Sequence, residues 1–208
     1  MLFFRESPSI FKSSGIAIGN NLLGLPWVKN LARSNNSFIV ERDTNAIEML
    51  RSSQRLSHYI RHILQVDQRS VWIAQREGRT KDGNDLTQPG LLKMLKMAGP
   101  KDFAENYAEL NIVPVAISYE YDPNAAMKVN ELRTIETEGA YTKGPMDDFN
   151  SMFMGCVGHK GMVHYQFGES ITIEKLQALD GKVPINEKIK NLAEHIDKFV
   201  YAHYKLFP

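Results

Sequence analysis

Residues 70–85 read SVWIAQREGRTKDGND, and this stretch organises the rest of the chain. An apolar run over 71–74 changes abruptly into arginine, lysine, acidic residues and glycine, and the next apolar residue is Leu86. Such a change predicts a buried β-strand that ends at a sheet edge and presents charged side chains there. The alternation of cations with carboxylates indicates a capacity to bind anions. A solvated charged loop between a strand and a helix explains the composition slightly better when composition alone is considered.

Length and composition restrict the class of protein. We expect the 208 residues to form a single domain with a substantial core. The formal net charge of +1 argues against a dedicated nucleic-acid binder, which usually carries a basic excess. Cys156 is the single cysteine, so the sequence predicts neither a disulfide framework nor a cysteine zinc site, and its cysteine usage fits the cytoplasm. No apolar run approaches the roughly 20 residues that a bilayer-spanning helix needs.

Strand-like and helix-like segments alternate along the chain. We expect strands at 15–18, 37–40, 71–74, 112–117 and 162–167. A long helix is expected from Asp43 or Asn45, where Asn45 and Glu48 resemble a capping box. Further helices are expected after Pro89, after Pro100, and over 186–204, where the pattern is amphipathic. The long helix from Asn45 should place one set of residues on one face: Met49, Leu56, Ile60, Ile63 and Leu64. Residues 119–143 fit neither pattern. The alternation predicts an α/β fold with a largely parallel central sheet flanked by helices.

Several common site chemistries do not fit the sequence. Gly78 and Gly83 have the spacing of a phosphate-binding P-loop, but Asn84 and Asp85 follow where lysine and serine or threonine are required. No dinucleotide-binding glycine motif and no nucleophile elbow is present. His58 and His62 lie one helical turn apart without a third ligand nearby, so no metal site is predicted.

Five ordered segments resemble motifs of the glycerolipid acyltransferases, which include glycerol-3-phosphate and 1-acylglycerol-3-phosphate acyltransferases. They are, in sequence order, 20–26 (NNLLGLP), 38–42 (FIVER), 73–79 (IAQREGR), 112–115 (IVPV) and 163–171 (VHYQFGESI). The resemblance extends over most of residues 16–171. It implies an acyltransferase-like fold and an enzyme of phospholipid synthesis. Such an enzyme transfers a fatty acyl group from a coenzyme A or carrier-protein thioester to a hydroxyl of glycerol 3-phosphate or lysophosphatidate. No further cofactor is implied.

The resemblance also implies roles for individual residues. Arg42 and Arg79 would hold the phosphate, because the planar guanidinium fork suits it, with Lys81 or Arg76 as a second cation. Glu77 matches the glutamate of the motif and would orient an arginine or the acceptor. Gly78 would let the backbone approach the substrate, and Thr80 belongs to the same substrate-binding set. From the residues alone, a salt bridge of Arg42 with Glu41 or Asp43 is as good an explanation. Pro114 is better explained as a strand-edge proline than as a wall of the cleft.

The chain departs from the family pattern in two places. The family motif continues after Glu-Gly with one residue and then arginine, whereas here Arg79 follows Gly78 directly, so that either Arg79 or Lys81 could hold the phosphate. The catalytic His-x4-Asp motif is expected upstream of residue 16, which predicts a chain that lacks the first strand and helix of the fold. His62 and Asp67 fit the pattern literally, but His62 would end a helix that the family histidine should begin, so we do not assign it as the base.

Two functional hypotheses follow. The first is an acyltransferase, possibly one that is inactive as this chain. The alternative is a non-catalytic lipid- or phosphate-binding module that retains the anion site; an unrelated hydrolase or phosphatase would need a nucleophile that the sequence does not show. Contact with the inner membrane face would be peripheral, through 22–27, where Trp27 suits an interface, although a core role fits these residues equally well.

Overall fold

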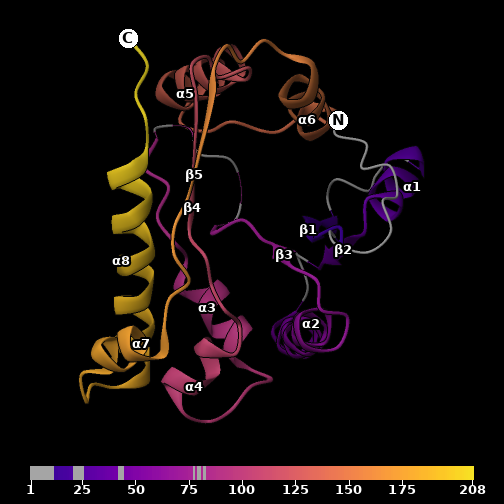
Figure 1. Cartoon of the computed structure of the whole chain (residues 1–208). Helices are drawn as coiled ribbons and strands as arrows, with labels where there is room; N and C mark the ends of the chain where they lie inside the picture. The colour runs from indigo at the N-terminus through magenta and orange to yellow at the C-terminus, as the bar shows by residue number, and fades with distance from the viewer. Residues whose placement is uncertain (1–11, 21–25, 42–44, 77, 79–80, 82) are drawn as a thin grey trace. The chain divides into compact units, whose positions relative to one another are not determined.

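The structure is a computed structural model, and it describes residues 12–20, 26–41, 45–76, 78, 81 and 83–208 (Figure 1). The chain divides into two compact units. The first unit comprises residues 1–74 and 93–101, and the second comprises residues 75–92 and 102–208. Helix α3 (Pro89–Lys96) contributes residues to both. The single domain expected over residues 1–208 stays a prediction.

The first unit is built on a parallel sheet with the strand order β2-β1-β3 in the described residues. Its strands are β1 (Gly15–Gly19), β2 (Ser37–Val40) and β3 (Val71–Trp72), and β1 pairs with both neighbours. Helix α1 (Pro26–Ser34) connects β1 to β2. Because the strands are parallel, β2 and β3 end at the same edge of the sheet.

Helix α2 (Ala46–Gln65) supplies apolar side chains to the first unit. Asn45 caps it as predicted, because its side chain accepts a hydrogen bond from the Glu48 N–H. Ile60 and Ile63 are buried, and a Cβ built on Gly15 would lie 3.4 Å from Ile63. Met49 was predicted on the same face, but 56% of its surface is exposed. The first turns of α2 therefore lack the burial that the helical pattern predicted.

The predicted strand 71–74 was wrong in length and burial. Only Val71 and Trp72 pair with β1, and Trp72 is 41% exposed. An apolar run of four residues was read as a buried strand, but periodicity alone cannot establish burial for so short a segment.

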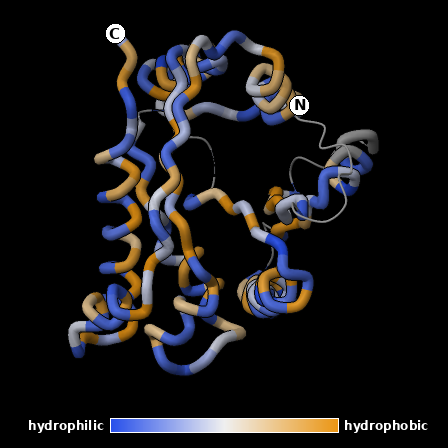
Figure 2. The backbone as a smooth tube through the Cα atoms, in the orientation of Figure 1, coloured by the Kyte–Doolittle hydropathy of each residue, from blue (hydrophilic) through white to orange (hydrophobic). Residues whose placement is uncertain are grey.

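The second unit contains an antiparallel pair, β4 (Val115–Tyr119) and β5 (Val163–Phe167), with α8 (Ile185–His203) beside β4 (Figure 1). Hydrophobic and hydrophilic residues alternate in bands along α8 (Figure 2), as predicted for 186–204, and Ile189, Leu192 and Ile196 are buried. Helices α4 (Phe103–Ala108) and α7 (Ile173–Asp180) pack together and contribute Tyr107 and Leu176 to this core.

The mixed α/β class is confirmed, with a small parallel sheet of three strands flanked by helices, but the two later predicted strands do not belong to that sheet. Among the described residues, β4 and β5 pair only with each other, and they run antiparallel. The chain between them, which the sequence left undecided, forms α5 (Ala125–Glu138) and α6 (Asp147–Val157). Helix α5 leaves Val129, Leu132 and Ile135 exposed. It therefore lacks the division into a buried apolar face and an exposed polar face by which a helix is recognised in a sequence. None of the helices that the structure describes has the length and apolar character needed to cross a membrane.

Candidate functional site

The two ends of residues 75–88, which we call the charged loop, lie together. The Gln88 N–H donates to the Gln75 carbonyl at 3.0 Å, which joins the two ends. The Gln75 side chain donates across the loop to the Asp85 carbonyl at 2.6 Å. A compact surface loop whose ends meet is a common setting for binding residues. The described ends of the segment that the sequence singled out are therefore joined.

Arg76 helps to close this loop from within. Its Nε lies 3.4 Å from the Asp85 carboxylate, and its Nη1 donates to the Asn84 carbonyl at 3.2 Å. Gly78 and Gly83 both have φ of +79°, a left-handed conformation that side chains other than glycine adopt at a cost. Gly78 is exposed, and no heavy atom of the described residues lies within 4 Å of a Cβ built there. The approach of a substrate to this backbone, which the resemblance implies, stays a prediction.

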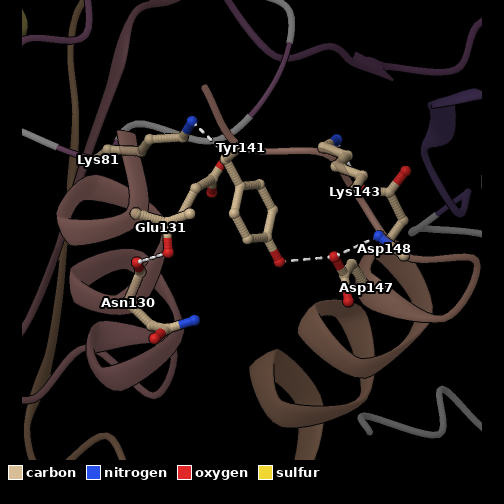
Figure 3. A network of polar contacts seen from close by, with 9 residues as sticks. Lys81, Asn130, Glu131, Tyr141, Lys143, Asp147 and Asp148 are labelled. Atoms are coloured by element: carbon tan, nitrogen blue, oxygen red, sulfur yellow. Dashed lines mark hydrogen bonds and ion pairs between the residues drawn. The ribbon is translucent and has the colours of Figure 1, made fainter. Parts of the chain in front are cut away.

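Lys81 is bound to helix α5. Its Nζ lies 2.5 Å from a carboxylate oxygen of Glu131, whose surface is only 6% exposed (Figure 3). The resemblance suggested Lys81 as a phosphate ligand, but here its charge already faces a carboxylate. The sequence did not reveal Glu131, because α5 shows too weak a pattern to indicate which of its acids are buried.

Helix α8 holds the carboxyl-terminal part of the charged loop. Thr87 donates to one carboxylate oxygen of Asp197 with both its backbone N–H, at 2.8 Å, and its hydroxyl, at 2.6 Å. The Tyr201 hydroxyl, one helical turn later, donates to the Asn84 side chain at 2.9 Å. Neither residue was predicted. The available signal was Asp197 itself, an acid next to Ile196 at a buried position of an apolar stripe, where an acid needs a partner.

A second set of contacts fixes the chain between α5 and α6 (Figure 3). The Tyr141 hydroxyl donates to Asp147 at 2.7 Å, and Lys143 pairs with Asp148 at 2.9 Å.

The pKa of Tyr119, at the end of β4, is raised, chiefly because burial disfavours the phenolate and also because Tyr165 lies nearby. Among the described residues, no group of three or more histidine, cysteine or acidic side chains could hold a metal ion.

Several predicted site residues lie outside the described residues: Arg42, Glu77, Arg79 and Thr80. Near the first of them, Glu41 pairs with Arg55 of α2 at 3.0 Å, with both side chains exposed. The structure therefore describes Gly78 and Lys81 of the predicted substrate-binding set, and of these it leaves Gly78 open.

The literal His-x4-Asp match comes together at the end of α2. His62 Nε2 lies 3.6 Å from Asp67 Oδ1, and the Asp67 N–H donates to the His62 carbonyl. His62 is exposed and lies in the last turn of the helix. Among the ion pairs between described residues, this is the one that joins a histidine to a carboxylate.

The two late motif segments are neighbours in the second unit. The Gly168 N–H donates to the Pro114 carbonyl and the Ile171 N–H to the Ile112 carbonyl, both at 2.9 Å. A Cβ at Gly168 would lie 2.9 Å from both Pro114 and Phe199, so these segments approach too closely for a side chain at this position.

Comparisons with protein-family models, curated proteins and solved structures found no match to this chain.

Proposed function

We propose that this chain is an acyltransferase domain with a glycerolipid-acyltransferase-like fold. It would transfer a fatty acyl group from a coenzyme A or carrier-protein thioester to a hydroxyl of glycerol 3-phosphate or lysophosphatidate. The observation that carries the proposal is the charged loop, which is closed on itself and anchored on two helices while the Gly78 backbone stays exposed. A loop that supplies donors in a fixed geometry suits the recognition of a phosphate.

Two cations of the charged loop, Arg76 and Lys81, already have carboxylate partners. Arg76 and Lys81 already face Asp85 and Glu131, and a cation with a carboxylate partner offers less net attraction to an anion. The resemblance gives the phosphate-binding role to Arg42 and Arg79, which lie outside the described residues. Glu77 would orient one of these arginines or the acceptor hydroxyl.

A second candidate is a non-catalytic module that binds lipid or phosphate through the same loop. The position of His62 favours it, because His62 lies in the last turn of a helix rather than in the first. Both candidates require the anion site. They differ only in whether a base removes a proton from the acceptor hydroxyl.

The test measures thiol release from a long-chain acyl thioester in the presence of glycerol 3-phosphate, together with calorimetric binding of glycerol 3-phosphate. Turnover that depends on the acceptor supports the acyltransferase, and binding without turnover supports the module. Absence of both refutes the anion site. If turnover occurs, its loss in His62→Ala would assign the base to His62.

Arginine variants test the assignment within the site. Arg79→Ala should weaken glycerol 3-phosphate binding about 10- to 150-fold, the effect of losing a charge-assisted hydrogen bond of about 1.5–3 kcal/mol. Arg51→Ala, at an exposed position of α2, is the matched control and should bind like the wild type. Equal affinity of the two variants would contradict the role given to Arg79.

A further inference from the structure

Two cations lie at the edge of the first unit's sheet where β1 and β3 begin. Lys12 Nζ donates to the Asp67 carbonyl at 2.6 Å, and Arg69 Nε donates to the Ser13 carbonyl at 2.9 Å. Both bonds join the segment before β1 to the segment before β3, so both cations lie between the same two segments. Each bond ends on a neutral carbonyl oxygen. Neither cation has its charge balanced by this contact.

The positive charge at this edge also lacks a balancing acid. No carboxylate in the described part of the chain pairs with Lys12 or Arg69, and the carboxylate of Asp67 faces His62 at 3.6 Å. Arg69 is half-buried, and its Nη2 atom is buried without a hydrogen-bond partner in the structure. A charged group that has lost part of its water without gaining a partner carries a free-energy cost. An anion bound here would reduce that cost.

Hydroxyl groups beside the two cations have protons left to donate. Ser13 Oγ accepts a hydrogen bond from the Asn36 side chain at 2.6 Å, which leaves the serine's own proton for another acceptor. The hydroxyl oxygens of Ser14 and Ser70 lie 2.6 Å apart. Because only one of them donates to the other, the second keeps its proton for a further acceptor. The edge therefore has more donors than its described acceptors use.

We infer that Lys12, Ser13, Arg69 and Ser70, which we call the basic cluster, form an anion site that binds a phosphate group. A phosphate suits this donor set, because guanidinium, ammonium and hydroxyl groups can each bond a different phosphate oxygen. The phosphate could belong to a soluble compound or to a lipid head group. The inference does not rest on the proposed function, because the basic cluster belongs to the first unit and the charged loop to the second.

The test follows the basic cluster directly by NMR. Inorganic phosphate, added to the whole chain at constant ionic strength, should cause saturable shifts in the backbone amide signals of residues 13–15 and 69–71. Chloride replaces phosphate in the reference sample, so that general screening of charge is the same in both. The same titration of Arg79→Ala should give the same shifts. A failure of the anion site proposed for the charged loop can therefore be distinguished from a failure of this one.

Lysine variants provide the matched control. Lys12→Gln removes the charge from the basic cluster, and Lys29→Gln makes the same change at an exposed position of α1. Phosphate should bind about two- to fivefold more weakly to Lys12→Gln, the range of an exposed ion pair, and equally well to Lys29→Gln and the wild type.

Arg69→Gln should weaken phosphate binding about 10- to 150-fold, the range for loss of a hydrogen bond to a charged group. This variant also removes the bond to the Ser13 carbonyl, so its unfolding temperature is measured alongside. If it does not fold, Lys12→Gln and its control decide the result.

Vesicles distinguish the two sources of phosphate. The chain is sedimented with phosphatidylcholine vesicles that contain or lack phosphatidate. Binding that needs phosphatidate and is weakened in Lys12→Gln assigns the site to a lipid head group, whereas NMR shifts without vesicle binding assign it to a soluble compound. The inference is overturned if phosphate causes no saturable shifts at residues 13–15 and 69–71, or if Lys12→Gln and Lys29→Gln bind it with equal affinity.

Discussion

Replacing Gly168 with alanine should destabilise the second unit, and the structure sets the size of the effect. The added Cβ would lie 2.9 Å from the Pro114 ring and equally close to the ring of Phe199. Ordinary contacts of such atoms begin near 3.4 Å, so both neighbours must move by about half an ångström. The Pro114 ring is rigid and its carbonyl is bonded to the Gly168 N–H, so on that side the backbone itself has to shift.

Overpacking of this kind costs about 1–3 kcal/mol. Alanine also restricts the unfolded chain, which offsets about 0.4–1 kcal/mol of that cost. We therefore expect Gly168→Ala to lower the free energy of unfolding by about 1–2 kcal/mol, measured by urea unfolding followed by far-ultraviolet circular dichroism. Tryptophan fluorescence is unsuitable, because both tryptophans belong to the first unit.

Two controls sharpen this experiment. Gly90→Ala, where no atom lies within 4 Å of the added Cβ, should be neutral or stabilising. In a Phe199→Leu background the clash with the ring is relieved, so the penalty of Gly168→Ala should shrink, and a double-mutant cycle measures the difference. A Gly168→Ala protein as stable as the wild type, or a penalty that Phe199→Leu leaves unchanged, would refute the packing described for Gly168.

Two further predictions concern other parts of the chain. Ser57 is buried and hydrogen-bonded to backbone groups of residues 95 and 98, so Ser57→Ala should cost about 1–3 kcal/mol in tryptophan-monitored unfolding, whereas Ser53→Ala on the same helix should be nearly neutral. Burial, together with Lys175 and Lys198, lowers the pKa of His195 below its ordinary 6.5, so the unfolded state binds its proton more readily. Stability contributed by neutral His195 is full above pH 6.5 and is lost as the pH falls toward the folded-state pKa. Urea midpoints measured from about pH 8 to pH 5 should therefore fall less steeply in His195→Gln.

The local elements with strong signals could be predicted from the sequence. The bounds of β2 were predicted without error, and β1 and β5 match within one residue. The cap of α2 follows from the short reach of the Asn45 side chain, and the buried stripe of α8 follows from its helical period. These features depend on neighbours along the chain, which the sequence displays directly.

The pairing of the later strands and the residues that bind the charged loop could not be predicted in the same way. Whether β4 joins a parallel sheet or pairs with β5 depends on where the intervening α5 and α6 place the chain, and the composition of those helices gave no clear face. The charged loop was found, but its anchors were not. Glu131 and Asp197 meet the loop from 50 and 110 residues away, and no local pattern encodes such a partner.

The same sequence separation has a consequence for synthesis. Thr87 leaves the ribosome 110 residues before Asp197. At a synthesis rate of about 5–20 residues per second, Asp197 is made roughly 6–22 seconds after Thr87. During that interval the charged loop cannot form its hydrogen bonds to Asp197. We therefore expect the charged loop to be among the last parts of the protein to mature, after the strand that precedes it has already been made.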